Sequence, residues 1–177
     1  MANPTKPTLK PGALCLAAGL LFGSACGEVD GNQIVPSDGS FDIATLMSSG
    51  GMPGPRNDND ECDSLYKETI AVTRATATVT WDTCALDVGV GHMVLDRGSR
   101  SLTVDELAGV SDALLEVVIG NDGLCGFDKP TVTLDVVRNG TVGRYVDDFY
   151  GCQPPPDGRI FVEKMDWVES AMWKLIR

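Results

Sequence analysis

PTVTLDVVRNGTVGRYVDDF, residues 130–149, is the stretch that decides how this chain folds. At its centre stands Asn139-Gly140, the strongest short-range signal for a β-hairpin, because a type I′ turn needs positive φ at both central residues. Asp135 then faces Arg144, which gives an opposite-charge pair across the two strands. The stretch therefore predicts two antiparallel strands joined by a tight turn.

A second hairpin is predicted earlier in the chain, in KETIAVTRATATVTWD, residues 67–82. Thr, Val and Ala alternate here, as they do in half-buried strands. A turn near Arg74-Ala75 places Ile70 opposite Val79. One face of this hairpin is then mainly apolar and is expected to be buried.

The pattern between the two hairpins is less regular. Residues 92–95 and 100–102 are predicted to form a further strand or a short hairpin, with residues 97–99 as the turn.

Two amphipathic helices complete the predicted elements. Residues 103–106, Thr-Val-Asp-Glu, have the spacing of a capping box, in which the Thr hydroxyl and the Glu carboxylate satisfy backbone amides at a helix start. This helix is predicted to run to about Val118, with Gly120 ending it and one apolar face made by Leu107, Val110, Leu114 and Val117. The last helix is predicted from about residue 161 or 163 to residue 176, through Met165, Val168, Met172 and Leu175.

These elements predict an α+β fold in a single domain, residues 62–177: two antiparallel β-hairpins forming a sheet with about two packed helices. Residues 26–61 are acidic and rich in Gly and Pro, and they lack sustained periodicity. They are therefore predicted to be a flexible linker, in which a short helix or strand around residues 41–47 can dock locally.

The N-terminus has the layout of an export signal. Residues 1–25 contain no Asp or Glu, carry Lys6 and Lys10, and run apolar over residues 13–22. Ten apolar residues are too few for a membrane-spanning helix, which needs roughly 20. Residues 1–25 are therefore predicted to be a cleaved signal peptide.

The signal ends in Gly-Ser-Ala-Cys, residues 23–26, which resembles the lipobox of bacterial lipoproteins. The resemblance implies that Cys26 carries a diacylglyceryl thioether and becomes the first residue of the mature protein. Gly23 departs from the pattern, because an aliphatic residue usually stands there. The same residues also fit the small-x-small rule of ordinary secretion, which would leave Cys26 unmodified.

Cysteine arithmetic favours lipidation. Cys15 leaves with the signal, so simple secretion leaves five cysteines, whereas lipidation of Cys26 leaves four that can pair. Among the three possible connectivities, the positions of the cysteines at the open ends of the two hairpins favour one: Cys62–Cys84 and Cys125–Cys152.

Charge excludes some partners. The chain has 25 acidic and 14 basic residues, a formal net charge of −11 at pH 7. Such a surface repels nucleic acid and anionic membranes, so neither is an expected partner except for the membrane that holds the lipid anchor. The charge favours a basic or cationic ligand, and the expected lipid anchor makes an envelope protein a candidate partner.

No residue set has the pattern of a catalytic or metal site, and no cofactor is expected. His92 is the only histidine, and Asp147-Asp148 and the pair Glu163 and Asp166 are the acids that a hydrolase would use. NDNDECD, residues 57–63, alternates oxygen ligands for calcium but lacks the Gly and Glu of an EF-hand loop. The acids and the histidine are as readily explained as solvated surface residues.

The sequence thus predicts a lipid-anchored protein of the cell envelope with a non-catalytic binding or structural domain. In enteric bacteria an Asp after the lipidated cysteine favours the inner membrane, so Gly27 implies the outer membrane. CGFDKPTVTLDV and DDFYGC, residues 125–136 and 147–152, resemble small cysteine-containing envelope domains. The order hairpin, helix, hairpin, helix also resembles emfourin-type protease inhibitors, which would imply an exposed loop such as residues 153–158.

Overall fold

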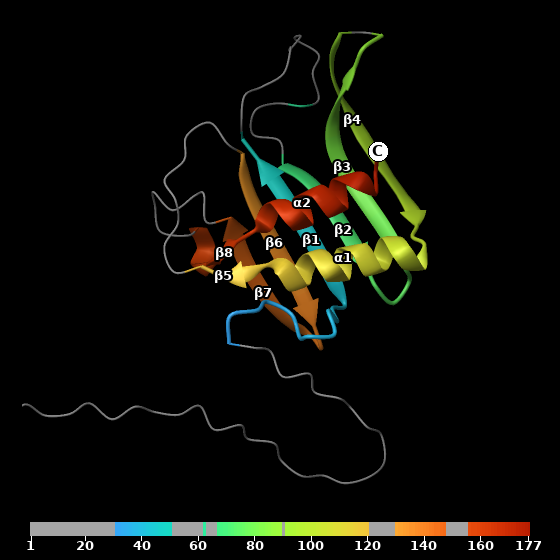
Figure 1. Cartoon of the computed structure of the whole chain (residues 1–177). Coiled ribbons are helices and arrows are strands. Elements are labelled where there is room, and N and C mark those ends of the chain that lie inside the picture. The colour runs from blue at the N-terminus through green and yellow to red at the C-terminus, as the bar shows by residue number, and fades with distance from the viewer. Residues whose placement is uncertain (1–30, 51–61, 63–66, 90, 121–129, 148–155) are drawn as a thin grey trace, which may run out of the picture.

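The computed structural model describes residues 31–50, 62, 67–89, 91–120, 130–147 and 156–177 (Figure 1). Eight strands form one sheet in the order β4-β3-β2-β1-β6-β7-β8-β5. The elements are β1 Ile43–Ser49, β2 Lys67–Thr73, β3 Thr78–Asp87, β4 His92–Ser101, α1 Val104–Glu116, β5 Val118–Ile119, β6 Thr131–Arg138, β7 Thr141–Asp147, β8 Ile160–Glu163 and α2 Met165–Lys174. The α+β class and the two helices are confirmed, but the sheet is larger than two hairpins, and the β7–β8 pair makes it mixed.

Strand β1 lies at the centre of the sheet and joins the two predicted hairpins. Leu46 pairs with Ile70 of β2 on one side and with Leu134 of β6 on the other. The prediction that residues 26–61 are a linker is therefore wrong for β1, and the domain includes strand residues that precede Cys62. The seven residues of β1 are too few for their sequence pattern to identify a strand. The backbone hydrogen-bonding groups of β1 are satisfied by β2 and β6, which lie far from it in the sequence.

Residues before β1 also belong to the domain. Gln33 forms a β-bridge with Val118, and Val35 and Phe41 are buried in the core. The guanidinium carbon of Arg74 lies 5.6 Å from the centre of the Phe41 ring, a cation–π contact that covers this segment. The folded unit therefore includes the segment before β1 as well.

The hairpin of β6 and β7 has the predicted register. Asn139 and Gly140 have φ of 49° and 75°, and Asp135 faces Arg144. In the hairpin of β2 and β3, however, Ile70 faces Trp81 and not Val79. The four-residue loop Arg74–Ala77 replaces the expected two-residue turn, and a shift by two residues leaves the same side chains on the same face.

The predicted turn at residues 97–99 is absent, because β4 runs through it as one strand paired with β3. Gly98 lies opposite Trp81, and a Cβ atom at Gly98 would come within 2.3 Å of Cζ2 of that indole. Glycine is therefore needed at position 98 because the Trp81 ring packs across β4 at this point, and not because the chain turns there.

The helix boundaries differ from the prediction in two places. The capping box of α1 is present, but the helix ends at Glu116 because Val117 is already extended and β5 follows, so Gly120 caps no helix. The last helix, predicted from about residue 161 or 163, begins only at Met165, because Ile160–Glu163 form β8, parallel to β7. Lys164, with φ of 63°, separates β8 from α2.

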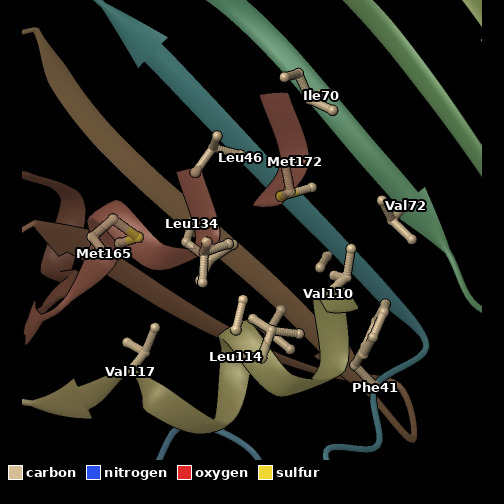
Figure 2. Packing of buried hydrophobic residues seen from close by; sticks show 14 of the residues in the cluster. Phe41, Leu46, Ile70, Val72, Val110, Leu114, Val117, Leu134, Met165 and Met172 are labelled. Atoms are coloured by element: carbon tan, nitrogen blue, oxygen red, sulfur yellow. The ribbon is translucent and has the colours of Figure 1, made fainter. Parts of the chain in front are cut away.

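Both helices cover the same face of the sheet and enclose the core with it (Figures 1 and 2). Figure 2 shows Leu46, Ile70 and Leu134 of the sheet pointing towards the helices, whose buried residues include Val110, Leu114, Met165 and Met172. All of these are at most 2% exposed. This apolar layer between sheet and helices supplies the main stabilisation of the fold.

A two-stranded arm extends beyond the sheet at the ends of β3 and β4 (Figure 1). Only residues 78–82 of β3 pair with β2, whereas β3 and β4 stay paired as far as Asp87 and His92. The Cys62–Cys84 disulfide, as predicted, ties the arm at its base. Cys125 and Cys152 lie outside the described residues.

Candidate functional site

The start of α1 is fixed to the end of α2 by a cluster of polar contacts. Arg100 donates to Oε1 of Glu106 from Nη2 over 2.7 Å, and to the Leu175 carbonyl from Nε over 2.8 Å. The Thr103 amide donates to Oε2 of Glu106 over 2.8 Å. Hydrogen bonds from Arg100, followed by the Thr103 amide, lower the pKa of Glu106 to about 2. Through Arg100, the cluster links the start of α1 to the residue that follows α2.

We expect this cluster to make the stability depend on pH. Because the pKa of Glu106 is lowered from 4.5 to about 2 on folding, its contribution is present above pH 4.5 and is lost as the pH falls towards 2. Urea unfolding of the wild-type chain and of Glu106→Gln should therefore give a gap in stability that narrows between pH 5 and pH 2.5. The other acids titrate in both proteins, so a gap that stays constant over this range would contradict the role of Glu106.

A groove of about 540 Å³ lies between α1 and α2. Its apolar lining comes from both helices: Val110 and Ala113 of α1, Ala171 of α2, and Leu175 just after α2. The small side chains of Gly109, Ala113, Ser170 and Ala171 leave the space open. Trp167 stands at this groove with 57% of its surface exposed, one of the few large apolar side chains left in solvent among the described residues.

The charged residues of the groove are mostly acidic. Glu106, Asp112 and Glu116 line it, against one basic residue, Lys174. Glu116 also accepts a hydrogen bond from Nζ of Lys164 over 3.2 Å, with both side chains about half exposed. An apolar floor with an acidic rim can bind a segment that combines apolar and basic side chains.

A second groove, of about 470 Å³, lies on the other side of α2. Its charged lining consists of the carboxylates of Asp166, Glu68 and Glu169 and the cations of Lys174 and Arg177. Oε1 of Glu68 accepts the Cys84 amide over 3.0 Å, which assigns this carboxylate a structural contact. The guanidinium carbon of Arg177 lies 5.4 Å from the centre of the Trp173 ring.

The residues singled out from the sequence as possible catalysts are not brought together. His92 is at the start of β4, opposite Asp87 in the arm, and lines neither of these two grooves. Asp147 ends β7 and Glu163 ends β8, and neither lines one of these grooves, whereas Asp166 lines the second. Asp148, Cys26 and residues 57–61 lie outside the described residues. Within the described part of the chain, no group of three or more His, Cys, Asp or Glu side chains is placed to hold a metal ion.

Sequence reasoning did not find the groove between the helices, although one signal was available. In α2 the apolar positions Met165, Val168 and Met172 recur at helical spacing and face the core. Trp167 is not part of this repeat, so the helical pattern places its indole away from the core. A large aromatic residue on the polar face of a helix is typical of binding surfaces.

No family model, no curated protein and no solved structure matches this chain. The structure is a small α+β domain with a groove between its two helices. In the part of the chain that the structure describes, no helix is long and apolar enough to cross a membrane.

Proposed function

We propose that this chain is a lipid-anchored protein of the cell envelope whose domain binds a partner, without catalysis, in the groove between α1 and α2. The observation that carries this proposal is the groove itself: 540 Å³, an apolar floor, and the exposed indole of Trp167 beside it. Exposed Trp side chains in such surroundings often supply much of the binding energy of an interface.

The acidic rim indicates what the partner looks like. Three carboxylates and one lysine line the groove, two of the carboxylates being paired with Arg100 and Lys164 outside it, and the whole chain carries a net charge of −11. A partner segment with apolar side chains flanked by Lys or Arg complements both features, and its association should weaken as salt is added. An amphipathic helix of an envelope protein has this chemistry.

Lipidation of Cys26 is proposed from the lipobox-like residues 23–26 and from the cysteine count, and Gly27 favours the outer membrane. We expect Cys26→Ala to move the protein from the membrane to the soluble fraction of its native host. Intact mass should show the wild-type chain to start at Cys26 and to be heavier by a diacylglyceryl group. An unmodified wild-type chain, or a Cys26→Ala chain that stays membrane-bound, would contradict the anchor.

The groove is tested by photo-crosslinking in host cells. A photoreactive p-benzoylphenylalanine at Trp167 should give one discrete protein adduct, and Ala171→Arg, which fills the groove with a cation, should abolish it. The control is the same residue at Ile160, which is 45% exposed on β8 and lines none of the three grooves. Equal labelling at both positions, or an adduct that survives Ala171→Arg, would rule out the groove as the binding site.

A second candidate function, protease inhibition, is supported by the arm. Leu86 and Val88 at its end are 50% and 90% exposed, and exposed apolar side chains at the tip of a hairpin are one form that an inhibitor can present to a protease. The loop first expected for this role, residues 153–158, is described only from Pro156 onward. Loss of inhibition of any susceptible protease on Val88→Asp, with Trp167→Ala as control, would favour this function over partner binding in the groove.

A further inference from the structure

Asn32 and Gln33, which contact β5, lie only a few residues after the cysteine that would carry the lipid. The Ile119 amide donates to the Asn32 carbonyl over 2.7 Å, and Gln33 forms a bridge with Val118, so the chain is held in the fold from Asn32 onward. Only residues 27–31 separate Asn32 from Cys26, and a chain of this length spans at most about 20 Å. If Cys26 is lipidated as proposed above, this end of the domain stands at the membrane surface. The arm lies at the opposite end of the molecule (Figure 1).

A third groove, of about 390 Å³, opens at this membrane-proximal end. It lies between the segment that follows Asn32, at Gln33 and Ile34, and the turn of the β6–β7 hairpin. Its polar lining includes Arg138, Asn139 and Thr141. Guanidinium, amide and hydroxyl groups are the donors that proteins use to bind phosphate oxygens.

Tyr145 contributes to the wall of this groove. Gly143 makes room for it, because a Cβ atom at Gly143 would come within 2.3 Å of the Tyr145 Oη atom. Burial raises the pKa of the Tyr145 hydroxyl, while the positive charge of Arg138 acts in the opposite direction. Tyr145 and Arg138 thus both line this groove.

The charge of this groove differs from that of the other two. Acidic side chains line both of those, whereas no carboxylate lines the third. Arg138 makes no ion pair with any described residue. Oδ2 of Asp42 accepts a hydrogen bond from the backbone amide of Asn139 over 2.6 Å, so this carboxylate is paired with the turn and not with Arg138. In an acidic chain, this groove is the one suited to an anion.

We propose that this groove binds the phosphate of a phospholipid headgroup beside the lipid anchor, with Arg138 as its cation. The net charge of the chain repels an anionic bilayer at a distance. The anchor overcomes this by holding the domain at the surface, where even a weak site meets lipid at a high effective concentration. Headgroup binding then fixes which face of the domain the membrane leaves free for a partner.

The experiment uses the processed chain, residues 26–177, with Cys26→Ala, because every described element lies after residue 30. The ¹⁵N-labelled protein is titrated with dihexanoylphosphatidylglycerol below its micelle concentration and, separately, with inorganic phosphate. We expect the lipid to shift the amide signals of Gln33, Thr141 and Gly143 with a dissociation constant in the millimolar range, and inorganic phosphate to bind more weakly. Arg138→Gln should weaken lipid binding about tenfold, since it removes a charge-assisted hydrogen bond.

The matched control is Arg144→Gln, which removes the same charge from β7 on the opposite face of the sheet, across from Asp135. It should change the affinity less than twofold. Equal effects of the two substitutions, no shifts on addition of lipid, or equally strong binding of inorganic phosphate would each overturn the headgroup site. Because this chain lacks the lipidated cysteine, the result is independent of whether Cys26 is modified in cells.

Discussion

Leu46→Ala is expected to lower the free energy of unfolding by about 2–5 kcal/mol, the usual cost of truncating a buried Leu. Leu46 is 2% exposed and belongs to β1, with Ile70 and Leu134 as its neighbours on the adjacent strands. Truncation leaves a cavity between the sheet and α2 that rigid strands on both sides cannot fill. Urea unfolding followed by circular dichroism at pH 7 gives the value.

The matched control is Met47→Ala, one residue further along the same strand. Met47 points to the opposite face of the sheet and is partly exposed, so its truncation should cost less than about 1 kcal/mol. If both substitutions lower the free energy of unfolding by less than about 1 kcal/mol, residues 43–49 do not form the central strand. The linker predicted from composition would then be the better description.

The elements that sequence reasoning predicted correctly depend on residues close together in the chain. The type I′ turn at Asn139-Gly140 and the capping box at Thr103 need only two to four residues, and their chemistry is local. The Cys62–Cys84 disulfide was also predictable from nearby residues, because its two cysteines lie 22 residues apart at the open end of one hairpin.

What the sequence did not predict depends on distant partners. β1 is stabilised by pairing with β2 and with β6, which begins more than 80 residues later, and its own neighbours in sequence are rich in Gly and Pro. The same holds for the candidate site. The periodicity of each helix was readable, but the groove arises from the way α1 and α2 pack side by side on the sheet, which depends on contacts between residues far apart in the chain.

Gly98→Ala is expected to destabilise the fold by about 1–3 kcal/mol, the range for overpacking. The added Cβ would lie 2.3 Å from Cζ2 and 2.7 Å from Cη2 of Trp81, closer than any real Cβ contact. Aromatic rings do not bend, so the indole must move out of its place over β4. Tryptophan fluorescence should shift together with the loss of stability measured in urea.

Gly109→Ala is the control for the glycine substitution itself. Gly109 lies in α1 with no atom within 4 Å of an added Cβ, so Ala there should stabilise the chain by about 0.4–1 kcal/mol. A double-mutant cycle then isolates the collision: in a Trp81→Leu background, the cost of Gly98→Ala should largely disappear. An unchanged cost in that background would show that the indole does not cross Gly98, and the turn at residues 97–99 expected from the sequence would regain its support.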